Sequence, residues 1–226
     1  ENKIKKNIVF GNSLDQNLYL VGKKAQPVSL DFYKDKDYAI FLESATPLFE
    51  GDNQLIGEHK EAQITKENWT ISLNKFFSFL EKELRLQVLI SPHPKVKHPN
   101  KFPDYYYGRR VLDDFAYLNS KKAKLLITRI STGISNAILN NIPIMIIYNN
   151  EIKRNKGMLS KQFFISNQIG VDPINIDNYD KNYILNRSLD YNKDKYQKYK
   201  KNYLTLREDN LKNSDIFIEL LDKQSK

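Results

Sequence analysis

The chain has 226 residues, 40% of them hydrophobic, so it can bury a sizeable core in one large domain or two small ones, which excludes disorder over most of its length. It contains no cysteine, which excludes disulfides, thiolate metal sites and cysteine nucleophiles and fits a reducing compartment, so the cytoplasm is the default expectation. No apolar run approaches the roughly 18 residues that cross a bilayer, and the formal charge of +9 favours anionic partners such as nucleotides, nucleic acid or an acidic membrane face.

The beginning of the chain has an ambiguous pattern. NIVFGNS and NLYLVG are apolar enough to be strands, and we interpret residues 1–36 as a remnant or edge of an N-terminal domain. Because the sequence starts without methionine, we expect a fragment or a processed chain. The first clear element follows: DYAIFLESA, from Asp37 to Ala45, is an apolar run between a charged residue and a Thr-Pro pair, which is typical of a buried strand.

The next two predicted elements are a helix and a second strand. After a polar loop, TKENWTISLNKFFSFLEKEL starts with Thr65 as a plausible cap and Glu67 in the first turn. Its apolar residues form one stripe at helical spacing: Trp69, Leu73, Phe76, Phe77, Leu80 and Leu84. LQVLIS (86–91) then predicts a buried strand that ends at PHPK, because two prolines do not continue a strand in the middle of a sheet.

The middle of the chain repeats this alternation. VLDDFAYLNSKKA (111–123) predicts a helix, Lys124 to Thr128 a third buried strand, the stretch from Gly133 a further helix, and Ile142 to Tyr148 a fourth strand. Apolar strands separated by helices predict a Rossmann-like α/β fold, with a parallel sheet and helices on both faces, over residues 37–188.

The last third of the chain predicts long helices. Apolar residues recur at helical spacing at Tyr196, Tyr199, Tyr203 and Leu206, and a second apolar group runs from Ile216 to Leu221. We interpret residues 189–226 as a C-terminal helical extension that folds back on the sheet.

The first polar motif lies at the end of the second strand. Ligands of open α/β sheets bind beyond the carboxyl ends of the strands, and His93-Pro94-Lys95 falls there. A histidine held between prolines can donate a hydrogen bond to a phosphate or act as general acid toward a departing phosphate oxygen, while the lysine adds charge. Such a histidine is more often structural or simply exposed. We interpret His98-Pro99 as a loop repeat of similar composition and favour His93, which is closer to the strand.

The second polar motif, STGIS, lies between the third strand and the following helix. Backbone N–H groups, the hydroxyls of Ser131, Thr132 and Ser135, and the turn at Gly133 suit anion binding, and Arg129 adjoins them. Serine and threonine before a helix are equally often ordinary caps. Together the two motifs suit a diphosphate, or a monophosphate linked to a sugar.

Carboxylates at loop positions are the candidates for acid–base chemistry. Glu43 ends the first strand, Glu50 and Asp52 lie in LFEGDN, and Asp113 and Asp114 begin the later helix. A carboxylate at a strand's carboxyl end can serve as a base or bind ribose hydroxyls, although most such groups are solvated.

The remaining polar and aromatic residues narrow the choice of chemistry. Arg109 and Arg110 either hold phosphate or cover a helix, and the tyrosines at 105–107 either stack on a base or sugar or pack under a loop. Three histidines without cysteine argue against zinc, and the absence of GxxxxGK[ST] and GxGxxG removes the usual support for nucleotide hydrolysis and dinucleotide redox chemistry.

The order strand, HPK, helix, strand, STGISNAILNNIPI, strand resembles the C-terminal, donor-binding half of bacterial surface-polysaccharide glycosyltransferases of the GT-B type. The pattern is most similar to His-Pro-motif sialyltransferases and Kdo transferases, and to the glycerol-phosphate polymerases of teichoic acid synthesis. The resemblance covers residues 38–148. It implies that His93 and the hydroxyls of Ser131, Thr132 and Ser135 engage the phosphate of a cytidine nucleotide without a metal.

The resemblance also has departures. Asn141-Ile142 replaces the usual Gly-Lys of the following strand, and the sialyltransferase motif of two acids before a glycine has no clear counterpart, Glu50-Gly51 being a poor substitute. In GT-B enzymes the acceptor site, and often the base, come from an N-terminal domain. The chain is too short to contain that domain in full, so one expectation is that it is only the donor-binding half, which would bind nucleotide and transfer nothing.

The sequence thus predicts a metal-independent glycosyltransferase, or its donor-binding domain, of surface-polysaccharide synthesis. The expected partners are a nucleotide-sugar donor, with CMP-linked sialic acid or Kdo favoured, and a glycan or lipid-linked acceptor. The basic surface would keep a cytoplasmic protein at the anionic face of the inner membrane. A CDP-glycerol-type glycerophosphotransferase, an epimerase, and a non-catalytic basic module that binds nucleic acid are the alternatives, although no RRM, KH or helix-turn-helix signature supports the last.

Overall fold

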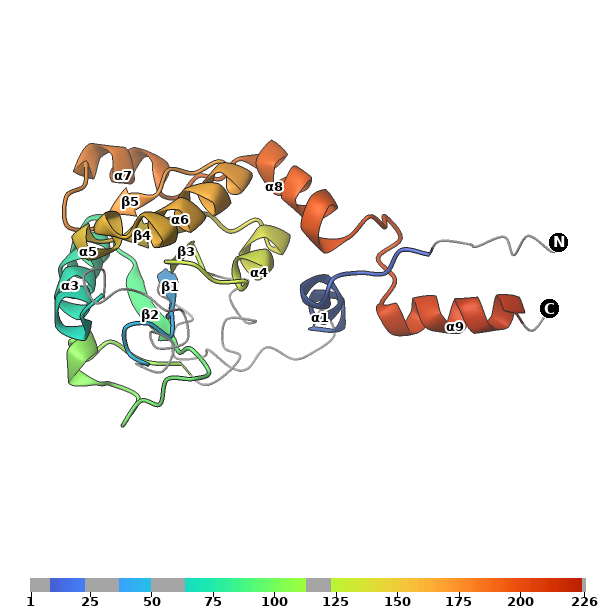
Figure 1. The fold of residues 1–226 in the computed structure, drawn as a ribbon, viewed down its shortest axis with the longest axis horizontal. Coiled ribbons are helices and arrows are strands. Elements are labelled where there is room, and N and C mark those ends of the chain that lie inside the picture. Colours follow the sequence, from blue (N-terminus) through green and yellow to red (C-terminus); the bar gives the residue numbers. More distant parts are fainter. Residues whose placement is uncertain (1–8, 23–36, 50–63, 113–122, 225–226) are drawn as a thin grey trace.

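The structure is a computed structural model that describes residues 9–22, 37–49, 64–112 and 123–224. Its centre is a parallel sheet in the order β2-β1-β3-β4-β5 (Figure 1). The strands are β1 (Tyr38–Leu42), β2 (Gln87–Ser91), β3 (Leu125–Thr128), β4 (Ile144–Tyr148) and β5 (Ile174–Asn175). The Rossmann-like parallel sheet is therefore confirmed, and four of its strands lie where the apolar runs predicted them.

The strand order reverses direction at β1. From β1 the chain crosses to β2 on one side, and β3, β4 and β5 follow on the other. In such sheets ligands bind in the crevice outside the carboxyl ends of the strands, at the point where the order reverses. The polar motifs after β1, β2 and β3 all lie at this edge.

Both faces of the sheet are buried, which explains why the strands are apolar throughout instead of alternating. The face toward α3 (Lys66–Glu83) buries Ala39, Phe41, Val88, Ile90, Leu125, Ile127, Met145 and Ile147. The opposite face buries Tyr38, Ile40, Leu42, Leu89, Leu126, Ile144 and Ile146 against α4 (Ile134–Leu139), α6 (Lys156–Ile169) and α8 (Lys193–Tyr199).

Helix α3 begins as the sequence predicts. The Thr65 hydroxyl accepts a hydrogen bond from the Asn68 amide at 3.4 Å, and the predicted stripe from Trp69 to Leu80 packs on the sheet. The other elements of the described residues are α1 (Leu14–Gly22), the 3-10 turn η3 (Asp104–Tyr106), α5 (Asn150–Arg154), α7 (Lys181–Arg187), the π-helical η5 (Lys200–Leu204) and α9 (Asn213–Gln224). The helix predicted at 111–123 falls mostly outside the described residues.

The strand expected at NLYLVG is wrong, because these residues belong to helix α1. The buried side chains of α1 are Gln16 and Leu20, whose spacing of four residues fits one face of a helix and not the alternation of a strand. Ser13 caps the helix, with its hydroxyl accepting from the Gln16 amide at 3.1 Å.

The C-terminal third is helical, as predicted, and its helix α8 packs on the sheet, but α9 does not fold back and projects from the sheet body (Figure 1). Tyr196 is completely buried, and its hydroxyl donates to the carbonyl of Ile142 at 2.9 Å. The expected apolar stripe does not continue, because the π turn pairs the Thr205 amide with the Lys200 carbonyl at 3.0 Å and rotates the later residues away from the sheet. Tyr203 and Leu206 are therefore exposed.

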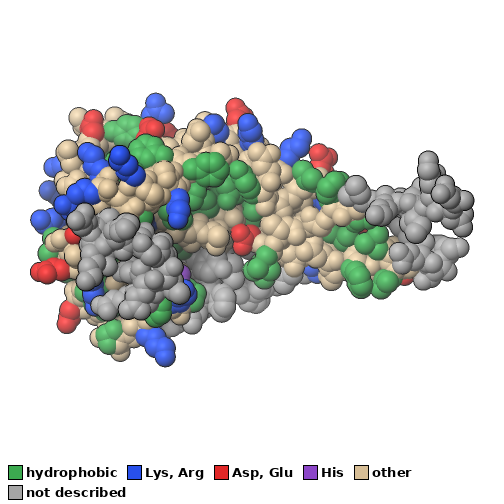
Figure 2. Space-filling view, in the orientation of Figure 1, with side chains coloured by type: hydrophobic (Ala, Val, Ile, Leu, Met, Phe, Trp, Pro, Cys, Tyr) green, Lys and Arg blue, Asp and Glu red, His purple; other side chains and the backbone are tan. Residues whose placement is uncertain are grey.

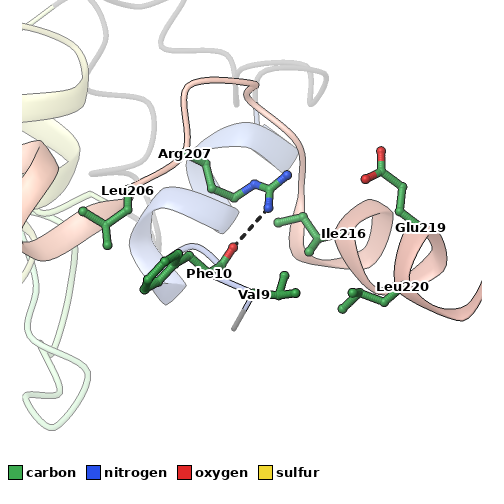
Figure 3. A pocket seen from close by; sticks show the side chains of 7 residues that line it. All are labelled: Val9, Phe10, Leu206, Arg207, Ile216, Glu219 and Leu220. Atoms are coloured by element: carbon green, nitrogen blue, oxygen red, sulfur yellow. Dashed lines mark hydrogen bonds between the residues drawn. The ribbon is translucent and has the colours of Figure 1, made fainter. Parts of the chain in front are cut away.

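Helix α9 and residues 9–13 form an arm that projects from the sheet body (Figure 1). Arg207 donates to the Phe10 carbonyl at 3.2 Å, and a cavity of about 280 Å³ lies between Val9, Ile216 and Leu220 (Figure 3). In Figure 2, lysine and arginine side chains gather over the body and hydrophobic ones appear on the arm. No helix in the described ranges is long and apolar enough to cross a membrane.

Candidate functional site

The candidate site is the carboxyl edge formed by β1, β2 and β3. Leu42 pairs with Ser91 on one side and with Thr128 on the other, so the three strands end at one level. The residues that follow are Glu43 after β1, the His93 loop after β2 and Arg129 after β3. Register therefore brings both predicted motifs to one edge, with Glu43 between them.

Glu43 is a buried acceptor of hydrogen bonds. Its side chain is 1% exposed; one oxygen accepts from the Tyr106 hydroxyl at 2.5 Å, and the other accepts from the His93 amide at 3.1 Å and lies 3.0 Å from Nε2 of His98. This arrangement satisfies a buried carboxylate. Glu43 is a predicted base, but at this exposure its carboxylate is not open to direct contact with a ligand.

Of the two His-Pro histidines, it is His98 whose ring reaches the carboxylate. Its side chain is 6% exposed and lies between Glu43 on Nε2 and the Tyr105 hydroxyl on Nδ1. His93, the favoured candidate, contacts Glu43 through its backbone, and its ring Nδ1 accepts from the Lys95 amide at 3.2 Å in a local turn. The interpretation of His98 as a mere loop repeat is therefore wrong.

Two neighbouring tyrosines complete this cluster. Burial, followed by the negative charge of Glu43, raises the pKa of Tyr105 to about 12. The same causes, with the hydrogen bond to Glu43, raise the pKa of Tyr106 well above its ordinary value. Both hydroxyls therefore remain protonated at neutral pH and act as hydrogen-bond donors.

Arg129 places a buried positive charge at the end of β3. The residue is 8% exposed, and its guanidinium lies 6.0 Å from the centre of the Trp69 ring, in the first turn of α3. In the same turn, the ammonium of Lys66 lies 5.0 Å from the centre of the Tyr105 ring. The first turn of α3 thus touches both the Glu43 cluster and the end of β3.

The STGIS hydroxyls take three different positions. Ser131 accepts from the Gly133 amide at 3.1 Å within a local turn, while Thr132 is exposed. Ser135 is buried and hydrogen-bonded with Tyr199 of α8. Thr132 and the turn around it therefore face solvent at the edge, whereas Ser135 holds α8. Helix α4, which follows, has only six residues.

Gly133 is required by close packing. A Cβ atom built there would lie 2.8 Å from Cδ1 of Leu42 and 3.2 Å from Oγ of Ser131. The turn can therefore sit against the end of β1 only with glycine at this position.

The other predicted residues are placed as follows. Pro94 and Lys95 are exposed in the loop after β2, where the Lys95 ammonium lies 5.7 Å from the centre of the Phe49 ring. Glu50, Asp52, Asp113 and Asp114 lie outside the described residues. Arg109 has a structural role, since it pairs with Glu81 of α3 at 2.7 Å and donates to Asn74 at 2.8 Å.

The sequence analysis missed Glu151, which joins α5 to the start of α3. Its carboxylate accepts from Thr65 through both the amide, at 3.0 Å, and the hydroxyl, at 2.9 Å, and from the Asn68 side chain at 2.7 Å. Burial alone would raise the pKa of this carboxyl, but the hydrogen bonds outweigh it and the pKa is lowered. No local pattern links residues this far apart; only the predicted Thr65 cap marked one end of the contact.

Within the described ranges, no three His, Asp or Glu side chains are grouped so as to hold a metal ion. A cavity of about 490 Å³ lies far from the candidate edge, beside Ile144 at the start of β4 and next to Gly170 and Asp190.

Comparison with known proteins finds no match: no family model fits the sequence, and no curated protein and no solved structure is significantly similar to it. The function must therefore be argued from the site.

Proposed function

We propose that the chain binds a nucleotide-activated sugar at the carboxyl edge of β1, β2 and β3 and acts as a glycosyltransferase or its donor-binding half. The observation that carries the proposal is the grouping, at the reversal point of a parallel sheet, of a buried arginine, an exposed Thr132 turn and the His93–Lys95 loop. Positive charge and N–H donors at this position suit a phosphate.

The roles of the residues follow from their places on the edge. Arg129 and the turn at 131–133 would bind the phosphate after β3, and Lys95 would add charge from the loop after β2. His93 would neutralise or protonate the departing phosphate as the glycosidic bond breaks. The choice of a cytidine nucleotide, and of sialic acid or Kdo as the sugar, rests on the family resemblance of the two motifs.

Thermal-shift titration with CMP, CDP, UDP and GDP tests nucleotide binding. We expect one cytidine nucleotide to raise Tm by roughly 5 °C at a concentration of about 100 times Kd, because a ligand that binds only the folded state stabilises it by mass action. The shift should fall in His93→Ala and in Ser131→Ala.

A matched pair of lysine variants tests whether nucleotide binding depends on a local site or on the overall positive charge of the chain. Lys95→Gln removes a charge at the carboxyl edge, whereas Lys124→Gln removes one just before β3, at the opposite edge, where Lys124 pairs with Asp37 at 3.7 Å. Only Lys95→Gln should weaken the nucleotide shift. Equal weakening by both, or indifference of the wild type to all four nucleotides, would reject the proposal, and steep salt-dependent binding of RNA without nucleotide selectivity would favour the nucleic-acid alternative.

A further inference from the structure

The three consecutive tyrosines at 105–107 have three different environments. Tyr106 is completely buried with its hydroxyl on Glu43, Tyr107 is 65% exposed, and Tyr105 is half-buried with its hydroxyl on His98. Of the two that belong to the Glu43 cluster, Tyr105 is therefore the one that a substrate can touch.

The hydrogen bonds fix the direction of proton donation through the cluster. A carboxylate is only an acceptor, so Nε2 of His98 carries the proton that points at Glu43, 3.0 Å away. In neutral histidine the other nitrogen then has no proton, and Nδ1 accepts from the Tyr105 hydroxyl. The result is a chain from Tyr105 through His98 to a buried carboxylate, which is the order of groups that activates a hydroxyl in hydrolase triads.

We propose that Tyr105 is the catalytic general base toward the acceptor hydroxyl, with His98 and Glu43 as positioning residues that receive and stabilise its proton. This inference rests on the proposed transferase function. It supplies the base that the sequence lacks, since the acidic motif of the related families has no clear counterpart in this chain.

The step is balanced without a further reactant. The acceptor hydroxyl passes its proton to the Tyr105 oxygen while the Tyr105 proton moves to Nδ1 of His98. The acceptor oxygen forms the new bond to the anomeric carbon, and the bond from that carbon to the phosphate oxygen breaks with its electron pair on the phosphate. The imidazolium that results is paired with Glu43; water in place of the acceptor gives hydrolysis of the donor.

The charges around Tyr105 suit this role. The Lys66 ammonium from α3 lies 5.0 Å from the ring centre and favours transient negative charge on the phenol, while the Glu43 carboxylate, 3.0 Å from Nε2 of His98, opposes it. Tyr106, another titratable group among the described residues, also packs against the histidine ring, with ring centres 6.1 Å apart. The first turn of α3, which carries Lys66, also carries Trp69 beneath Arg129, so the base lies on the proposed donor edge.

The test compares Tyr105→Phe with Tyr107→Phe, because each removes one hydroxyl from the same run of tyrosines, and of the two only Tyr105 belongs to the Glu43 cluster. The readout is release of CMP from CMP-linked sialic acid and CMP-linked Kdo, with water or a glycan as acceptor. Tyr105→Phe should lower kcat by roughly 100-fold or more at unchanged CMP affinity. Tyr107→Phe, at an exposed side chain outside the cluster, should leave kcat within about threefold. A Tyr105→Phe variant with kcat within about threefold of wild type would overturn the inference.

The role of His98 has a readout that a structural role would not move. His98→Gln, whose side chain cannot take a proton, should lower kcat by roughly 100-fold at unchanged CMP affinity. A kcat within about threefold of wild type in His98→Gln would show that another group receives the proton.

Failure of the two proposals can be told apart. If no cytidine nucleotide binds, the proposed function fails, and nitrogen-15 NMR of His98 then decides the relay: the Nε2–H tautomer is expected, with an Nδ1 resonance that moves in Tyr105→Phe. The Nδ1–H tautomer would refute the relay. If CMP binds but the wild type releases none from either donor, the binding proposal stands and the catalytic role of Tyr105 is wrong.

Discussion

Two regions at one edge of the sheet use their polar residues in opposite ways. After β1 and β2, the side chains of Glu43, His98 and Tyr106 bond to one another in a buried cluster. After β3, Ser131 accepts within its own turn and Thr132 is exposed. In the first region the carboxylate oxygens are already occupied by neighbouring donors, whereas the second region is a turn exposed to solvent.

The difference shows that a residue's type does not decide whether it meets a ligand. Glu43 and Arg129 each follow a strand directly, and both are buried, but Glu43 is surrounded by donors from the loop after β2 while Arg129 stacks over Trp69 beside the open turn. Substrate contact is therefore expected from Tyr105 and Lys95 on one side and from the turn at 131–133 on the other.

The largest effect is expected from Glu43→Ala in the closed region. The variant leaves the buried hydroxyl of Tyr106 and the ring of His98 without an acceptor, and each unsatisfied buried group is costly, so we expect the free energy of unfolding to fall by roughly 3 kcal/mol. Urea denaturation followed by circular dichroism measures it. Thr132→Ala in the open turn is the control and should change the value by less than about 0.5 kcal/mol; equal losses in both would remove the contrast between the regions.

A second effect arises where the two regions touch, at Gly133. In Gly133→Ala the new methyl group would meet Leu42, which is 5% exposed and cannot turn aside without moving the core. We expect a loss of about 1 to 2 kcal/mol. Gly157→Ala in α6 is the matched control, because its nearest neighbour is 3.5 Å away, and it should stabilise by up to about 1 kcal/mol. A neutral Gly133→Ala would mean that the turn can move away from β1.

Much of the sheet was predictable from the sequence because its strands are buried on both faces. A continuous apolar run such as that of β1 can be recognised as a strand without knowing which strands pair with it. Strand β5 was not predicted, since it has only two residues, Ile174 and Asn175, and gives no periodic signal. The residues of helix α1 have an ambiguous pattern, apolar enough for a strand, and the cap at Ser13 is the local signal that marks them as a helix.

The candidate site was predictable as an edge but not as a set of contacts. The prolines after β2 and the turn after β3 marked where the strands end, and the strand register places these ends side by side. His93 and His98 are each followed by proline, and what distinguishes them is the packing of the His98 ring between Tyr105 and Glu43, which lies 55 residues earlier in the chain. Such contacts depend on the path of a loop, and a loop has no periodic sequence pattern from which its path can be predicted.

The smallest effect concerns Glu151, which links the two regions by capping α3 from the β4 side of the sheet. Because its pKa is lowered in the folded chain, the carboxylate stabilises the fold above its unfolded pKa, near 4.5, and this contribution disappears as pH falls through the folded value. We expect Glu151→Gln to cost about 1 kcal/mol at pH 7 and progressively less toward about pH 3, as measured by urea denaturation. Glu83→Gln, the same change at the other end of α3 where the side chain is 40% exposed, should stay within about 0.5 kcal/mol at every pH. A Glu151→Gln cost that does not change with pH would mean that side-chain shape, and not the charge, holds α3 to α5, and the two regions would then be joined by packing alone.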